Sequence, residues 1–182
     1  AMLSCLVGSE MCIRDSIIVD KNGKTNLDNI YAVGDVIGPP WLAHVSSSEG
    51  LYVVEHIAKL SPKKIDYDCI PACTYSKPEI GSIGLSQKIL DERGIDYKVV
   101  KSFFNANGKA VASDSTEGFI KILVSDRNQI LGAHIIGSNA TEMISEFSLA
   151  MSNNLSVENI LDSIHPHPTF SEAIFETLMH LK

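Results

Sequence analysis

The chain has 182 residues, and its 15 Lys and Arg against 22 Asp and Glu give a formal net charge of −7. Its 45% hydrophobic and 20% charged residues are ordinary for a globular protein and exclude a disordered tail or a fibrous repeat. The acidic balance, with no Lys/Arg stripe, excludes nucleic acid as an expected partner. No run of 18 apolar residues is present, so the sequence predicts no membrane span.

The first segment does not fit the pattern of the rest of the chain. Residues 6–16 resemble translated sequencing-adapter sequence, and one interpretation is that they are not native to the protein. We therefore leave residues 1–16 unassigned and base the predictions on the chain from Ile17 onward.

Short apolar runs separated by turn residues follow. Residues 17–20 predict a short strand, and 22–23 are the hairpin-turn dipeptide Asn-Gly. The apolar run 30–33 predicts a buried strand that ends at Gly34 and Asp35.

A helix is predicted over about residues 44–60, because apolar residues recur along it at helical spacing. The Ser-Pro-Lys-Lys sequence at 61–64 ends this helix, and we place a domain boundary there. The predicted domains are 17–64 and 65–182.

The second domain alternates differently. Strands are predicted at 70–76, 80–84, 97–104, 118–125 and 130–136. A short helix is predicted at 86–93, ending at Gly94, and three further helices follow the strands. Strands linked by hairpins and followed by helices indicate an α+β domain with an antiparallel sheet.

Capping patterns predict where the last three helices begin. The first starts near Asn139, which forms a capping-box pair with Glu142, and its apolar face is formed by Ala140, Ile144, Phe147 and Met151. Ser156 caps the second, with Leu155 and Ile160 as a hydrophobic staple. Thr169 caps the last helix, which buries Ile174, Leu178 and Leu181.

Four cysteines are too few for a disulfide scaffold, which makes a cytoplasmic location the expectation. Cys69 and Cys73 are spaced as C-x₃-C, which is neither the redox pair C-x₂-C nor a zinc-knuckle spacing. If residues 69–75 form a strand, the two thiols lie about 13 Å apart and cannot share one metal ion. The sequence therefore predicts no metal site at these cysteines.

The segment from His165 to Glu172 has the most informative chemical pattern. Each histidine precedes a proline, which favours extended backbone, and Thr169 with Glu172 forms a capping box that predicts a helix start. His167 then lies just outside a helix N-terminus, with a carboxylate in the first turn. Glu172 would accept a hydrogen bond from one imidazole nitrogen and leave the other to exchange a proton with a substrate, as in general acid–base catalysis.

Two other interpretations of this segment stay open at the level of the residues. In one, Glu172 is only a helix cap and His167 is an ordinary surface histidine. In the other, His165 and His167 bind a metal ion together, although no third ligand is evident nearby.

A second chemical pattern lies at Gly34 and Asp35, directly after the predicted strand 30–33. A carboxylate at the carboxyl edge of a sheet lies where nucleotide cofactors bind, and Asp35 can accept hydrogen bonds from sugar hydroxyls. Gly34 permits close approach of the backbone, and a helix beginning near His44 points amide groups at an electron-rich ligand. The alternative is a simple Gly-Asp turn between two strands.

Together these motifs resemble the C-terminal part of the flavin-dependent pyridine-nucleotide disulfide oxidoreductase family, over about residues 17–182. The resembling segments are 25–36, 41–44, 49–50, 74–80, 84–86, 132–137 and 140–142, followed by the His-x-His-Pro-Thr-x-x-Glu motif that starts at His165. The resemblance implies a remnant of a Rossmann-like FAD-binding domain at 17–64. It implies an antiparallel-sheet dimerisation domain with flanking helices at 65–182.

The resemblance also implies roles for particular residues. His167 would be the acid–base residue and Glu172 its partner, and they would serve the redox disulfide of the other subunit of a homodimer. His165 and Pro168 would belong to the same interface. Contacts to FAD would come from Gly34, Asp35, Leu42, Ala43 and His44.

The earlier histidine of the motif is most similar to members that oxidise dihydrolipoamide with NAD, whereas glutathione-reductase-like members share only the His-Pro-Thr core. The implied partners are a second copy of the chain and a lipoyl-bearing domain of a 2-oxo acid dehydrogenase complex or of the glycine cleavage system. The implied location is the cytoplasm, or the mitochondrial matrix in a eukaryote. A glutathione-reductase-like disulfide reductase and a non-catalytic dimerisation module are the alternatives.

The sequence also departs from the family pattern. The family's Gly-x-Gly-x-x-Gly FAD motif, its C-x₄-C redox pair and its NAD-binding domain do not occur in these 182 residues. We therefore expect the chain to be part of a longer enzyme, to hold FAD only through a partial site, and to lack turnover by itself.

Overall fold

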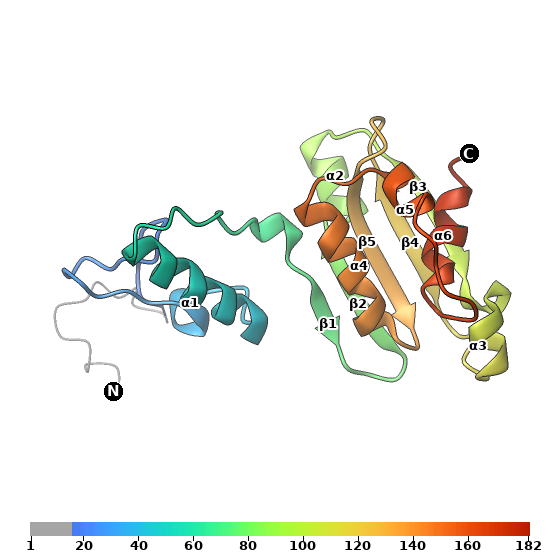
Figure 1. Cartoon of the computed structure of the whole chain (residues 1–182), viewed down its shortest axis with the longest axis horizontal. Coiled ribbons are helices and arrows are strands. Elements are labelled where there is room, and N and C mark those ends of the chain that lie inside the picture. Colours follow the sequence, from blue (N-terminus) through green and yellow to red (C-terminus); the bar gives the residue numbers. More distant parts are fainter. Residues whose placement is uncertain (1–15) are drawn as a thin grey trace. The chain divides into compact units, whose positions relative to one another are not determined.

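The computed structural model describes residues 16–182 (Figure 1). The predictions for residues 1–15 lie outside the described residues. The chain divides into two compact units, the first ending at Ile65 and the second formed by Asp66–Lys182. Among the described residues, no helix has both the length and the apolar character needed to cross a membrane.

The first unit contains a 3₁₀ helix η1 (Gly34–Ile37) and the helix α1 (Ala43–Ile57). The strands predicted at 17–20 and 30–33 are wrong, since no strand is assigned among residues 16–65. Val33 is extended, but the only ladder contact near it is a single bridge between Lys24 and Tyr31. A strand is stabilised by ladder hydrogen bonds to neighbours, and within this unit the run 30–33 has too few to form one.

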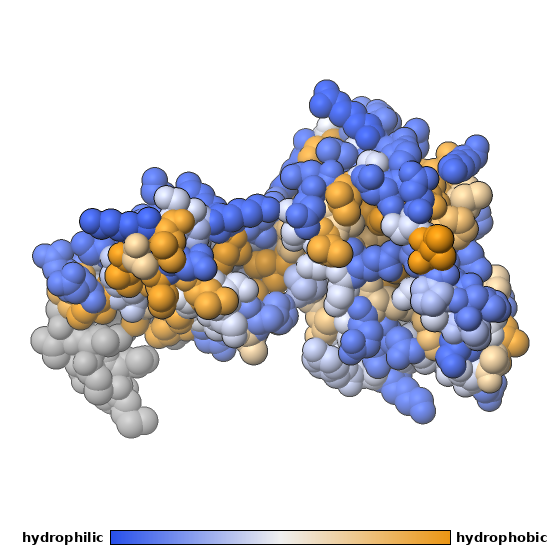
Figure 2. All heavy atoms as spheres, in the orientation of Figure 1, coloured by the Kyte–Doolittle hydropathy of each residue, from blue (hydrophilic) through white to orange (hydrophobic). Residues whose placement is uncertain are grey.

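The turn predicted at 22–23 is confirmed, because the N–H of Gly23 donates to the carbonyl of Asp20 over 3.0 Å and Gly23 has φ +77°. Helix α1 is also confirmed. Its buried face is formed by Val45, Glu49 and Val53, so the apolar residues on the rest of its surface lie open. The exposed apolar residues of α1 include Leu51, Val54 and Ile57. Figure 2 shows apolar surface in orange on this unit.

The second unit is built on one antiparallel sheet. Its strands are β1 (Ala72–Thr74), β2 (Glu79–Gly84), β3 (Lys98–Phe103), β4 (Phe119–Val124) and β5 (Ile130–Gly137). The strand order is β1-β2-β5-β4-β3, and all neighbours are antiparallel. The five predicted strands are therefore confirmed to within two residues at each end, and the α+β fold is confirmed with them.

Helices surround this sheet, and α4, α5 and α6 lie over one face of it (Figure 1). The helices are α2 (Gln87–Arg93), α3 (Gly108–Ala112), α4 (Ala140–Ser152), α5 (Val157–Leu161) and α6 (Glu172–Met179), with short 3₁₀ turns η2 (Tyr67–Cys69) and η3 (Phe104–Ala106). Gly94 ends α2 in the left-handed conformation, as predicted. Gly81 allows α4 to approach β2 closely, because a Cβ there would lie 2.5 Å from the carbonyl oxygen of Ala140.

The predicted apolar face of α4 is confirmed. Ala140, Ile144 and Phe147 are buried in one core cluster, with Met151 partly buried against it. The same core contains Ile174 and Leu178 of α6 and Ile160 of α5, with Leu155 and Leu181 packed against it. Burial of these apolar faces is the main force that fixes the helices on the sheet.

The capping box predicted at Asn139 and Glu142 does not form. Asn139 has φ +61° and its side chain makes no cap, whereas Glu79 of β2 accepts hydrogen bonds from the N–H and the hydroxyl of Thr141 over 3.1 and 2.7 Å. A carboxylate from a distant strand thus replaces the local cap. At α5 the cap is local, since the N–H of Ser156 donates to Oδ1 of Asn159 over 2.9 Å.

The strand geometry assumed for the two cysteines holds for Cys73, which lies in β1, but not for Cys69. Cys69 ends η2, and β1 begins only at Ala72, so residues 69–71 are not strand. The side chain of Asp66 accepts the N–H of Asp68 over 3.0 Å, which folds the chain into a turn at this point.

Candidate active site

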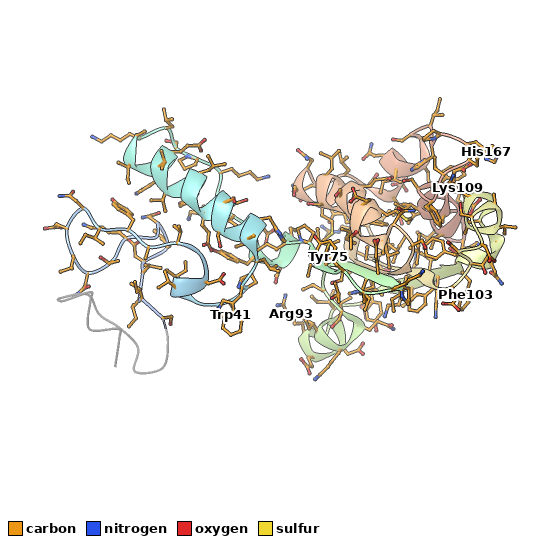
Figure 3. The ribbon with its side chains drawn as sticks, turned by 90° about the horizontal axis from the view of Figure 1, so that it is seen from below. Trp41, Tyr75, Arg93, Phe103, Lys109 and His167 are labelled. Carbon is orange, nitrogen blue, oxygen red and sulfur yellow. The ribbon has the colours of Figure 1, made fainter. Side chains whose placement is uncertain are left out.

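The predicted acid–base pair joins the loop 162–171, which contains His167, to the start of α6, where Glu172 lies. Nδ1 of His167 lies 2.8 Å from Oε1 of Glu172, the first residue of α6. The imidazole is 77% exposed and the carboxylate 21% exposed. In Figure 3, His167 lies at the outer edge of its unit, and a Cβ placed on Gly108 of α3 would be 4.0 Å from its ring.

The second oxygen of Glu172 is also bound. Oε2 accepts the backbone N–H of Thr169 over 2.7 Å. This backbone hydrogen bond, followed by the bond with His167, lowers the pKa of the Glu172 carboxyl below its ordinary value. Glu172 is therefore ionised at neutral pH and presents a fixed negative charge to the imidazole.

Only half of the capping box predicted at Thr169 and Glu172 forms. The hydroxyl of Thr169 donates to the carbonyl of Pro166 over 2.8 Å, and α6 begins at Glu172 after Ser171. Thr169 is therefore not the N-cap, because its side chain closes the loop that precedes the helix instead of the first helical turn.

The pair fixes the direction in which His167 can exchange a proton. With Nδ1 facing a carboxylate acceptor, Nδ1 carries the proton in the neutral ring and Nε2 is the basic nitrogen. Within residues 16–182, no hydrogen bond to Nε2 of His167 is present. A solvent-facing nitrogen, oriented through its partner nitrogen by a carboxylate, is the geometry of a general acid–base group.

His165 lies differently. Its side chain is only 9% exposed, and its Nε2 lies 2.9 Å from Oε1 of Glu146 on α4. Nδ1 of His165 lies 3.2 Å from the carbonyl oxygen of Ser163. Each histidine thus has its own carboxylate, and no group of three or more metal-ligating side chains is found in the described part of the chain.

Two contacts of this site were not predicted from the sequence, those of Glu146 and Asn107. Asn107 is 1% exposed and its Nδ2 donates to the carbonyl of Thr169 over 3.1 Å. The Asn-Gly dipeptide at 107–108 is the one local signal for Asn107, as a helix cap, and no sequence pattern pairs Glu146 with His165. Pro168 is exposed on the loop.

The residues predicted to contact FAD lie together in the first unit, where η1 packs against α1. The N–H of Gly34 donates to Oε2 of the buried Glu49 over 2.6 Å. Gly34 has φ +77°, and a Cβ there would lie 2.7 Å from Oγ of Ser46. Asp35 is exposed beside it. Glu49, which belongs to one of the segments of the family resemblance, thus lies on the buried face of α1 and holds the backbone of Gly34.

The N-terminus of α1 contributes the other three predicted residues. Leu42 is the N-cap and offers no side-chain hydrogen bond to the first helical turn, which contains Ala43 and His44. An apolar N-cap leaves the partial positive charge of the helix N-terminus available to a ligand.

Comparison with known proteins identifies the group to which this architecture belongs. The model of the pyridine nucleotide-disulphide oxidoreductase dimerisation domain matches residues 70–178, and a pyridine nucleotide-disulphide oxidoreductase model matches residues 6–50. The chain belongs to the pyridine nucleotide-disulphide oxidoreductase family. Members of this family bind FAD and NAD, and the matched dimerisation domain points to a homodimer.

Among its relatives is a dihydrolipoyl dehydrogenase of Bacillus subtilis, which is 42% identical over 171 residues, or 93% of this chain and 36% of the relative. The mitochondrial dihydrolipoyl dehydrogenase of Sus scrofa is 43% identical over 171 residues, or 93% of this chain and 33% of the relative. The flavoprotein disulfide reductase RclA of Escherichia coli has a similar structure, with a TM-score of 0.85, 27% identity, and coverage of 96% of this chain and 41% of RclA. The chain thus spans about a third of the length of the curated relatives it matches.

Proposed function

We propose that this chain is the C-terminal part of a dihydrolipoyl dehydrogenase, which oxidises dihydrolipoamide to lipoamide and reduces NAD⁺ to NADH. The observation that supports this most directly is the 2.8 Å pairing of His167 with Glu172, which leaves Nε2 of His167 open to solvent. The 42–43% identity to dihydrolipoyl dehydrogenases over this region supports the substrate assignment.

His167 acts on the thiol of the substrate. Nε2 takes the proton from one thiol of dihydrolipoamide, and the resulting thiolate attacks a disulfide, forming a mixed disulfide and releasing one sulfur of the enzyme as thiolate. The second substrate thiol then attacks the substrate sulfur of the mixed disulfide, which forms the ring disulfide of lipoamide and releases the second enzyme sulfur, so that the enzyme is left with a reduced dithiol. The ionised Glu172 stabilises the imidazolium that holds the proton between these steps.

FAD, when bound, supplies the route for the two electrons from the dithiol to NAD⁺. The residues of the first unit could hold such a group through Asp35, which is exposed and has a carboxylate able to accept hydrogen bonds from hydroxyl groups. The left-handed, Cβ-free backbone of Gly34 allows Ser46 of α1 to pack against it, and this packing holds Asp35 beside the helix. Leu42, Ala43 and His44 would contribute the helix N-terminus, and we expect the site in this chain alone to be partial.

The active site would be completed by a second copy of the chain. In a homodimer, His167 would serve the redox disulfide of the other subunit, with the exposed Pro168 at the interface. The lipoyl-bearing domain of a 2-oxo acid dehydrogenase complex or of the glycine cleavage system would deliver the substrate. His165 would support the same interface, and within its own chain its side chain contacts Glu146 and Ser163.

The experiment joins residues 17–182 of this chain to the N-terminal two thirds of the Bacillus subtilis relative, to give a full-length protein. We expect this chimera to bind FAD, to form a dimer and to produce NADH from dihydrolipoamide. Reduction of glutathione disulfide in place of this reaction would favour the alternative that the likeness to RclA supports, a reductase of another disulfide. An inactive dimer with FAD bound would favour the non-catalytic module.

The 182-residue chain alone is a matched control. Its sequence contains no C-x₄-C pair to accept electrons from the substrate. We therefore expect it to produce no NADH from dihydrolipoamide. Measurable turnover would contradict the proposal that the redox disulfide comes from another part of the enzyme.

A further inference from the structure

The loop that contains His167 is hydrogen-bonded to the rest of its unit at two points besides the acid–base pair. The first is His165, whose ring is buried next to Phe175 with 6.0 Å between ring centroids. Its Nε2 meets the carboxylate of Glu146 over 2.9 Å, and its Nδ1 meets the carbonyl of Ser163 over 3.2 Å. These two contacts connect His165 of the loop to α4 and to Ser163.

The second point is Asn107, which is buried at the start of α3. Its Oδ1 accepts the N–H of Ala110 over 3.0 Å and so caps the helix, while its Nδ2 donates to the carbonyl of Thr169 over 3.1 Å. One buried amide therefore joins α3 to the loop. The N–H of the same Thr169 donates to Oε2 of Glu172, so Thr169 connects Asn107 to Glu172 through hydrogen bonds.

Between these two points the loop has its own hydrogen bond, from the hydroxyl of Thr169 to the carbonyl of Pro166. His165 is thus bonded to α4, and Thr169 is bonded both to Pro166 and to Asn107 at the start of α3. The exposed ring of His167 lies between these residues, and among residues 16–182 its one hydrogen bond is to Glu172. An exposed ring loses its rotamer freedom at a cost, and rigid neighbours reduce that cost.

We propose that Glu146, His165 and Asn107 are positioning residues: they hold the loop so that Nδ1 of His167 faces Glu172 and Nε2 faces the substrate. The consequence for catalysis rests on the proposed function, whereas the geometric statement concerns this chain alone. His165 is then a buried strut between α4 and the loop, and its contact with a partner subunit is not needed for this role.

Two substitutions separate positioning from folding. His165→Phe keeps an aromatic ring beside Phe175 and removes both hydrogen bonds. Asn107→Asp keeps the oxygen that caps α3 and removes the donor to Thr169. Glu142→Gln is the control, because it changes a carboxylate on the same helix as Glu146 without a hydrogen bond to the loop.

The measurement is ¹⁵N NMR of the imidazole nitrogens of His167, together with amide exchange at Thr169, in the 182-residue chain at pH 7.5. In the wild type and in Glu142→Gln we expect Nδ1 to be the protonated nitrogen of His167 and Thr169 to exchange slowly. In His165→Phe and Asn107→Asp we expect the two nitrogen shifts to move toward each other and Thr169 to exchange at least tenfold faster. His165→Gln should recover part of the effect, since its amide can still donate to Glu146.

Folded His165→Phe and Asn107→Asp variants with wild-type His167 shifts and wild-type Thr169 exchange would overturn the proposal. Loss of the wild-type pattern in Glu142→Gln would overturn it too, because the effect would then not be specific to the fastened loop. The result is independent of turnover. If the chimera proves inactive while these shifts change as expected, the positioning stands and the proposed function fails.

Discussion

Glu172 binds two donors at once: its Oε1 lies 2.8 Å from Nδ1 of His167, and its Oε2 accepts the N–H of Thr169 over 2.7 Å. One carboxylate thus orients the imidazole while it is itself oriented by the backbone. The fixed carboxylate selects which nitrogen of His167 faces outward.

Replacing His167 by Gln in the chimera should lower the rate of dihydrolipoamide oxidation by about 10²–10⁴-fold, the usual contribution of a general acid–base group. FAD content, measured by its absorbance, should stay unchanged because His167 is not one of the residues assigned to the candidate flavin site. Glu172→Ala should lower the rate less, since the imidazole remains present. A His167→Gln chimera with near-normal turnover would reject the assigned role.

Acidification should remove the contribution of Glu172 to stability. Its pKa in the folded state lies below the ordinary value of 4.5, so its contribution is fully present above that value and is lost as the pH falls through the folded-state pKa. Urea unfolding at pH 7 and at pH 3 should show a smaller pH-dependent loss for Glu172→Gln than for the wild type. The exposed Glu92→Gln on α2 is the control, and it should keep the wild-type dependence.

Substitution of Gly34 by Ala should destabilise the first unit and reduce FAD retention by the chimera. The left-handed backbone alone costs an L-residue about 1–2 kcal/mol, and the new Cβ would meet Oγ of Ser46 at 2.7 Å. Gly50→Ala is a matched control in α1, where a Cβ meets nothing within 4 Å. There Ala should stabilise the helix by about 0.5–1 kcal/mol. Equal flavin retention and unfolding midpoints for the two variants would contradict this account.

The core of the second unit should depend strongly on Phe147. Its side chain is 0% exposed, so Phe147→Ala should lower the free energy of unfolding by about 3–5 kcal/mol. Leu149 lies on the same helix and is 65% exposed, and Leu149→Ala should change stability by less than about 0.5 kcal/mol. Denaturant unfolding measures both, and similar losses for the two would show that α4 packs differently.

The elements that could be predicted from the sequence are those whose causes lie within a few residues of one another. The strand pattern of the second unit, the stop of α2 at Gly94 and the apolar face of α4 are local periodicities, and each is confirmed. The pairing of His167 with Glu172 spans five residues and could be anticipated for the same reason.

The features that could not be predicted depend on residues far apart in the chain. Glu79 replaces Asn139 as the cap of α4 from 62 residues away. The run 30–33 has the composition of a buried strand, but a strand also needs neighbours that its own sequence does not encode. Asn107 donates a hydrogen bond to Thr169, which is also 62 residues away, and the two come together only in the folded unit.

The strand order β1-β2-β5-β4-β3 has a consequence for how the site comes into being. β5 pairs with both β2 and β4, so the five-stranded sheet is complete only after β2 has paired with β5, which is far from it in the sequence. Contacts of such long sequence separation form slowly. Asn107 follows β3 and Glu146 follows β5, and the loop needs both. The orientation of the His167 ring is therefore expected to form late in folding, and the proposed proton transfer would begin only after β5 has paired with β2 and β4.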